Sequence, residues 1–160
     1  MREFTIDIRV KVFQIEELSA EDHELIEQAR KATYHSYANY SKFYVGAALR
    51  LSDGSIQIGA NQENAAFPSG LCAERSAIFA AQSMCPEKSI EALAIAARND
   101  HGFIQEPITP CGACRQVILE MEDRYRHPIR ILLYGEHGVY QVESVKSLLP
   151  LSFVDDNMRF

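Results

Sequence analysis

Two cysteines spaced i and i+3, Cys111 and Cys114, directly follow Pro110. Proline favours the first turn of a helix, and residues three apart in a helix share one face. The two thiolates would therefore lie together where the helix dipole and free backbone N–H groups stabilise negative charge. Such a pair of sulfur ligands suits zinc. Taken alone, the pair fits a redox dithiol or one half of a structural zinc site equally well.

A third cysteine, Cys72, stands two residues before Glu74, where a second helix is expected to begin. Three protein ligands leave a fourth position open, which distinguishes a catalytic zinc site from a closed structural one. Zinc lowers the pKa of a bound water to about 7, and a neighbouring carboxylate can take up that proton and deliver it elsewhere. We therefore predict that Cys72, Cys111 and Cys114 bind one Zn²⁺ per chain and that Glu74 is the catalytic proton carrier.

Cys85 is the remaining cysteine, and as a fourth ligand it would make the site structural. It is expected at the far end of the helix that begins near Cys72, roughly four turns away. One zinc ion cannot easily contact both sulfurs. The five histidines show no ligand spacing. A structural zinc or binding module without turnover stays open as an alternative to an enzyme.

Hydrophobic patterning predicts the elements that position these residues. Residues 3–12 alternate strictly between apolar and polar, which indicates a half-buried strand. The pattern predicts further strands at 44–51, 56–60, 90–97, 129–134 and 139–142, and helices at 19–37, 72–85, 110–125 and 145–149. This order indicates an α/β protein with three layers, α/β/α, around a mixed, mostly five-stranded central sheet plus the extra N-terminal strand.

Composition and charge restrict the class of protein. The chain has 160 residues, 47% of them hydrophobic, which fits a single domain, with an N-terminal strand extension at 1–18 and a catalytic core at 19–155. The net charge of -6 and the lack of a basic stripe argue against a nucleic-acid partner. Charged residues in the first dozen positions exclude a signal peptide there, and no apolar run is long enough to span a membrane. We expect a cytoplasmic protein whose cysteines are thiols or metal ligands.

Several segments, in order along the chain, resemble the small, homotetrameric, zinc-dependent cytidine deaminases. Cys-Ala-Glu followed by Pro-Cys-x-x-Cys is the three-cysteine form of the zinc deaminase signature. The resemblance covers roughly residues 20 to 155. Its segments are 40–49 (YSKFYVGAAL), 61–65 (NQENA), 70–75 (GLCAER), 110–116 (PCGACRQ) and 148–153 (LLPLSF).

The resemblance implies a role for each matching position. Asn61 and Glu63 would hold the ribose hydroxyls, and Phe43 would pack near the base. The backbone around Ala73 would bind the pyrimidine carbonyl. Phe153 would close the pocket of a neighbouring subunit, which implies a homotetramer with shared active sites.

Two further positions have expected roles. Arg75 would hydrogen-bond to the thiolates and offset the negative charge that a third thiolate adds to the zinc site. Phe67 stands where the family commonly has tyrosine before Pro68, so one polar contact to ribose, across a subunit boundary, is in doubt. Asn39 replaces a common proline, and the strand at 3–12 precedes the family's usual start.

The implied reaction is hydrolytic deamination of cytidine and 2′-deoxycytidine to uridine and 2′-deoxyuridine in pyrimidine salvage. Zinc hydroxide would attack C4, Glu74 would shuttle protons, and ammonia would leave. A deaminase of another aminopyrimidine nucleoside, such as blasticidin S, shares the metal residues, although Asn61, Glu63 and Phe43 favour ribose. A nucleotide deaminase is disfavoured because the acidic Glu63 would repel a phosphate.

Overall fold

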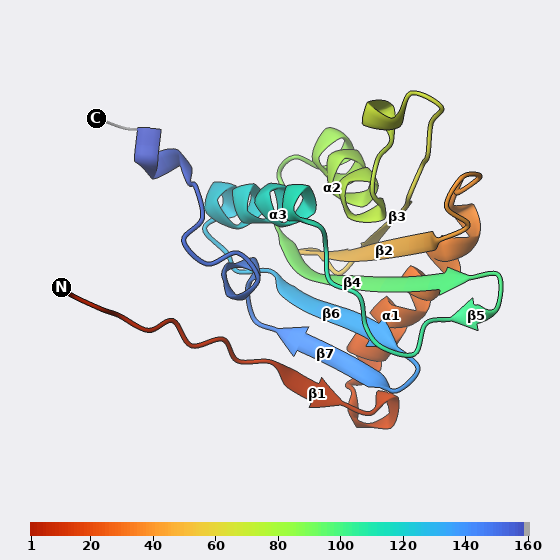
Figure 1. Cartoon of the computed structure of the whole chain (residues 1–160), viewed down its shortest axis with the longest axis horizontal. Coiled ribbons are helices and arrows are strands. Elements are labelled where there is room, and N and C mark those ends of the chain that lie inside the picture. The colour runs from red at the N-terminus through yellow and green to blue at the C-terminus, as the bar shows by residue number, and fades with distance from the viewer. Residues whose placement is uncertain (159–160) are drawn as a thin grey trace.

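A mixed β-sheet forms the centre of the computed structural model, which describes residues 1–158 (Figure 1). Its strand order is β1-β7-β6-β4-β2-β3, with β5 paired to β4. Strands β4 and β6 are parallel, and the other pairings between the strands of this sheet are antiparallel. The seven strands are β1 (Lys11–Phe13), β2 (Tyr44–Leu51), β3 (Ile56–Ala60), β4 (Ile90–Asn99), β5 (Gly102–Phe103), β6 (Arg130–Gly135) and β7 (Gly138–Val142).

Helices cover both faces of this sheet. Helix α1 (Ala20–Ala32) packs on one face, while α2 (Ala73–Met84) and α3 (Gly112–Tyr125) pack on the other (Figure 1). Each face has its own buried apolar cluster, as expected for a sheet that is covered on both sides. The predicted three-layer α/β/α class is confirmed. Within residues 1–158, no helix is both long and apolar enough to cross a bilayer.

Two details of the predicted sheet are wrong. The sheet has seven strands rather than five plus the N-terminal strand, because the added strand β5 is too short for an alternating pattern to reveal it. The predicted strand at 3–12 is reduced to β1, in which Lys11 pairs with Gln141 and Phe13 with Val139. Since β7 ends at Val142, which the register places opposite Val10, the residues before Val10 lie beyond the end of β7. Residues 1–10 are exposed.

The predicted final helix at 145–149 is also shorter than expected. Only a 3₁₀ turn, Val145–Ser147, forms there, and the Ser144 hydroxyl caps it by accepting from the backbone N–H of Lys146. Pro150 follows closely, and proline lacks the N–H that a longer helix requires. The last two positions of the predicted domain, 159 and 160, lie outside the described residues.

Close backbone approach seats helix α2 on the sheet. A Cβ at Gly59 in β3 would lie 2.3 Å from the backbone nitrogen of Ala77, so only glycine allows this contact. Ala73 and Ala77 are fully buried on the same helix, at the spacing of one turn. The small side chains on both elements fix the height of α2 above β3, and with it the position of the N-terminus of α2.

Candidate active site

Cys72, Cys111 and Cys114 converge where two helices begin. Cys72 is the N-cap of α2, Cys111 is the N-cap of α3, and neither cap side chain binds a backbone N–H. The three sulfurs all lie within 4.8 Å of one another, and those of Cys72 and Cys111 are 3.8 Å apart. The positive ends of two helix dipoles therefore meet at one cluster of thiols, which favours their ionised form.

The spacing of the sulfurs fits zinc. Tetrahedral Zn²⁺ with Zn–S bonds of about 2.3 Å places its sulfur ligands roughly 3.8 Å apart, the distance between Cys72 and Cys111. Within residues 1–158, these three cysteines are the only group of three or more candidate ligands. Cys85 is the C-cap at the opposite end of α2. The donor set is therefore three thiolates, as predicted.

Arg75 neutralises part of the charge on this cluster. Its Nη2 donates to the Cys72 sulfur at 3.5 Å, from one turn along the same helix. Hydrogen bonds from the Cys114 thiol and from Arg75 lower the pKa of Cys72 to about 5, against the opposing effect of burial. The pKa of Cys114 is raised instead, first by its hydrogen bond with Cys72 and then by burial. Of these two thiols, Cys72 therefore ionises first.

Glu74 lies beside the sulfurs, shielded from water. Its side chain is only 4% exposed, because it follows Cys72 into the first turn of α2 beneath the cluster. Burial, more than any other cause, raises the pKa of the Glu74 carboxyl above its ordinary value. A raised pKa makes the protonated carboxyl easier to reach, as a group that takes up a proton and later releases it requires.

An inner cavity of about 250 Å³ opens in front of the cluster. Phe43 and Ala73 face it from different elements, the segment before β2 and the first residue of α2. The N–H groups of the first helical turn have no partner within the helix, so the start of α2 offers donors to a ligand. The inner cavity is lined by Phe43, Val45, Asn61, Cys72, Ala73, Glu74, Ile108, Thr109 and Cys111.

An outer cavity of about 410 Å³ adjoins the inner one, since Asn61 and Cys72 line both. Glu63 faces the outer cavity, and its Oε2 accepts from the backbone N–H of Tyr40 at 2.7 Å and of Ser41 at 3.2 Å. Hydrogen bonds from the Ser41 side chain and the Tyr40 backbone lower the pKa of Glu63. The outer cavity therefore has a fixed anionic acceptor in its wall.

The Asn61 side chain is largely occupied by its own protein. Its Oδ1 accepts from the backbone N–H of Val45 at 2.8 Å and from the Ser36 hydroxyl, and its Nδ2 donates to the Phe43 carbonyl at 2.9 Å. These bonds tie the loop after β3 to the start of β2. Asn61 thereby positions Phe43, a role that its residue type alone does not reveal.

Two predicted aromatic residues stand apart from the inner cavity. Phe67 is 75% exposed at the rim of the outer cavity, where it makes an edge contact with the Tyr40 ring at 5.8 Å between centroids. Phe153 is 58% exposed and lines neither cavity, although its carbonyl accepts from the Gln116 side chain. Within one chain, the structure does not bring Phe153 to the site.

Arg115 is a residue whose part in the site the sequence did not single out. It donates to the carbonyls of Pro110 and Leu148 and to the Thr109 hydroxyl, so it joins the segment before α3 to the C-terminal segment. Its place next to Cys114 was the one available signal. The fork of donors in a guanidinium suits such a junction.

The comparisons with known proteins agree with this geometry. A family model described as "Cytidine and deoxycytidylate deaminase zinc-binding region" matches residues 19–126. A cytidine deaminase of Sporosarcina psychrophila is 39% identical over 137 residues, 86% of this chain and 94% of the relative. The cytidine deaminase of Halalkalibacterium halodurans is 39% identical over 134 residues, which cover 84% of this chain and 95% of that relative.

Solved structures give the same result. A crystal structure of cytidine deaminase from Burkholderia pseudomallei superposes with a TM-score of 0.71 at 38% identity, covering 82% of this chain and 98% of that one. The crystal structure of cytidine deaminase from Mycobacterium tuberculosis superposes with a TM-score of 0.65 at 30% identity, covering 85% of this chain and 99% of that one. With its three-thiolate site and these matches, the chain belongs to the family of zinc-dependent cytidine and deoxycytidylate deaminases.

Proposed function

We propose that this enzyme hydrolyses cytidine and 2′-deoxycytidine to uridine and 2′-deoxyuridine with release of ammonia, as a step of pyrimidine salvage. The observation that carries the proposal is the buried carboxyl of Glu74 beside three convergent thiols, at the wall of a cavity that continues past Asn61 to Glu63. One end of this continuous space offers proton transfer at a metal, and the other offers acceptors for sugar hydroxyls. A nucleoside has groups that match both ends.

The chemistry divides between the metal and Glu74. Bound zinc lowers the pKa of water to about 7 and so supplies a nucleophile at neutral pH. Glu74 would take up a proton from the attacking water and deliver it to N3 of the base. It would then take up the proton of the hydroxyl added at C4 and deliver it to the amine, so that the C4–N bond breaks and ammonia leaves. Its burial supports this role, because a raised carboxyl pKa allows both uptake and release.

The base and sugar are held by separate parts of the wall. Phe43 packs against the pyrimidine ring, and the backbone N–H groups at the start of α2, around Ala73, bind its carbonyl. Glu63 accepts hydrogen bonds from the ribose hydroxyls. Asn61 donates the second hydrogen of its Nδ2 to a ribose hydroxyl, because its Oδ1 already accepts two hydrogen bonds within the chain.

The proposal includes a homotetramer in which active sites are shared. Phe153 and Phe67 are large apolar side chains that remain exposed in one chain, and contact with a neighbouring subunit would bury them at its site. The catalytic core is residues 19–155 of one domain. We place the enzyme in the cytoplasm, where reduced thiols are available as zinc ligands.

A substrate panel tests the proposal. Zinc-replete protein is assayed by ultraviolet absorbance and ammonia release with cytidine, 2′-deoxycytidine, free cytosine, CMP and blasticidin S. We expect turnover of the two nucleosides and little with the base or the nucleotide. Turnover of blasticidin S with inert cytidine would overturn the substrate assignment. Bound zinc without ammonia from any compound would overturn the assignment as an enzyme with this site.

A further inference from the structure

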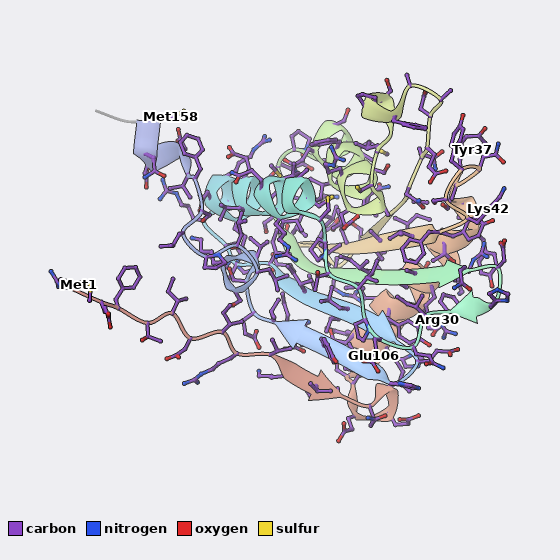
Figure 2. The ribbon with its side chains drawn as sticks, viewed as in Figure 1. Met1, Arg30, Tyr37, Lys42, Glu106 and Met158 are labelled. Carbon is purple, nitrogen blue, oxygen red and sulfur yellow. The ribbon has the colours of Figure 1, made fainter. Side chains whose placement is uncertain are left out.

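The N-terminal arm, residues 1–10, is an extended segment that lines neither cavity of the active site. It projects from the body of the molecule, with Met1 at its tip (Figure 2). Its apolar side chains alternate with polar ones and are open to solvent: Phe4 is 76% exposed, Ile6 47%, Ile8 49% and Val10 45%. Unpaired extended backbone with one apolar face is a template for another strand.

The arm continues an edge of the sheet. Strand β1 is the outermost strand on its side, so among the described residues its outer edge pairs with nothing. Val12 lies opposite Tyr140, which lies opposite Leu133 in β6, so these residues share the face covered by α2 and α3. Because side chains alternate along a strand, the even-numbered apolar residues of the arm extend that same face.

The apolar pattern is symmetric about Ile8. Apolar residues occupy positions 4, 6, 8, 10 and 12, so an antiparallel pair with Ile8 opposite the Ile8 of a second copy matches every one of them with an apolar partner. Phe4 then lies opposite Val12, and Ile6 opposite Val10. A two-fold axis through Ile8 generates this pairing, as an isologous contact between identical chains requires.

The charges select the same arrangement. In this register, Asp7 of each copy lies opposite Arg9 of the other, so the axis creates two pairs of opposite charge. A shift that centres the pair on Asp7 would set two carboxylates against each other. Parallel in-register pairing would do the same and would also oppose Arg9 to Arg9. Like charges directly opposite destabilise a strand pair.

We propose that the arm is an assembly strand, and that it pairs antiparallel with the arm of a second copy of this chain about a two-fold axis at Ile8. The two sheets then join through β1 into one continuous sheet. A second copy of this chain is the occupant because, in this register, the charges of Asp7 and Arg9 complement each other across the axis. This contact is separate from the subunit contact proposed for Phe153.

Charge reversal tests the pairing. Sedimentation velocity over a range of concentrations is measured for zinc-replete full-length protein and for Asp7→Arg, Arg9→Asp and the double swap Asp7→Arg/Arg9→Asp. Each single reversal opposes like charges twice and is expected to weaken self-association by about tenfold or more. The double swap restores opposite charges and should restore association. Glu16→Arg, outside the paired stretch, is the matched control and should leave association unchanged.

A cross-linking experiment tests the register. In a Cys85→Ser background, Ile8→Cys places two thiols across the axis, where opposed Cβ atoms lie about 5 Å apart, and mild oxidation should yield a covalent dimer. Ile6→Cys is the control on the same face, because residue 6 lies opposite residue 10 and should not link to itself. Deamination should persist in all of these variants, since none of them touches the cavities.

Three results would overturn the proposal. The double swap could stay as weakly associated as the single reversals, Ile6→Cys could cross-link as readily as Ile8→Cys, or removal of residues 2–10 could leave the association constants unchanged. Loss of the arm contact with full turnover of cytidine is consistent with the proposed function. If the wild-type protein does not turn over cytidine, the proposed function fails while the proposal for the arm is unaffected.

Discussion

Arg75 donates its Nη2 hydrogen bond to the sulfur of Cys72 at 3.5 Å, across a single turn of helix α2. Three thiolates around Zn²⁺ carry a net negative charge, which weakens the metal as a Lewis acid. A guanidinium bonded to one sulfur withdraws part of that charge. We therefore propose that the charge of Arg75 strengthens zinc as a Lewis acid at this site.

Replacing Arg75 tests this coupling. Arg75→Gln keeps a donor and removes the charge, and we expect kcat or zinc affinity to fall by about 10- to 100-fold, as for other groups bonded to metal ligands. Zinc content by mass spectrometry and steady-state rates with cytidine separate the two effects. Arg75→Lys is the matched control and should recover much of the loss. Equal kcat and equal zinc content of the Arg75→Gln and wild-type proteins would contradict the coupling.

Glu63 is expected to govern substrate affinity. Glu63→Gln keeps the size and removes the charge of the acceptor, so KM for cytidine should rise by about 10-fold or more, while kcat changes less. The matched control is a substrate, 2′,3′-dideoxycytidine, which lacks the hydroxyls that Glu63 would bind. An equal loss with both substrates would mean that Glu63 acts only through the Tyr40–Ser41 turn.

The lowered pKa of Glu63 sets the direction of its pH dependence. Hydrogen bonds from Ser41 and Tyr40 stabilise the ionised carboxylate of Glu63 in the folded protein. Their contribution to stability is therefore complete at pH values above the ordinary carboxyl pKa of 4.5. It is lost as the pH falls through the lower pKa that Glu63 has in the folded protein. We therefore expect no change in KM from Glu63 above about pH 5.5. A rise in KM between pH 8 and pH 6 that is absent in Glu63→Gln would contradict this.

An ion pair fixes the helix on the opposite face of the sheet. Both Asp22 oxygens, near the start of α1, accept from Arg130 in β6 at 2.7 Å, and Asp22 is only 8% exposed. Asp22→Asn leaves Arg130 without its carboxylate, and we expect a loss of about 2 kcal/mol in the free energy of unfolding. Urea denaturation measures it. Glu21→Gln, an exposed carboxylate in the same turn, should cost less than about 0.5 kcal/mol.

Local pattern predicted most of the elements that hold the site. The hairpin of β2 and β3 and the starts of α2 and α3 lie where the hydrophobic pattern and Pro110 predict them. The metal ligands were recognisable because Cys72, two residues before Glu74, adds a third sulfur to the i, i+3 pair Cys111 and Cys114. These features depend on neighbours in sequence, so residue types and spacing reveal them.

Other features depend on partners that are distant in sequence. The alternation at 3–12 is genuine, but whether it forms a strand depends on the length of β7, about 130 residues later. The residue type of Asn61 predicts a ligand for ribose, but it does not reveal that the amide oxygen also accepts from the Val45 N–H and the Ser36 hydroxyl. Phe153 matched a site residue by its type, while its side chain stays outside the cavities of its own chain.

Turnover of cytidine by the wild-type protein and by Glu74→Gln, compared at one zinc per chain, tests the central claim most directly. General acid–base catalysis is typically worth about 10²- to 10⁴-fold, and Glu74 is proposed to act in more than one proton transfer. We therefore predict that Glu74→Gln keeps its zinc and loses at least about 10²-fold in kcat. Comparable ultraviolet-monitored rates for the two proteins, or no uridine from zinc-replete wild-type enzyme, would contradict the account.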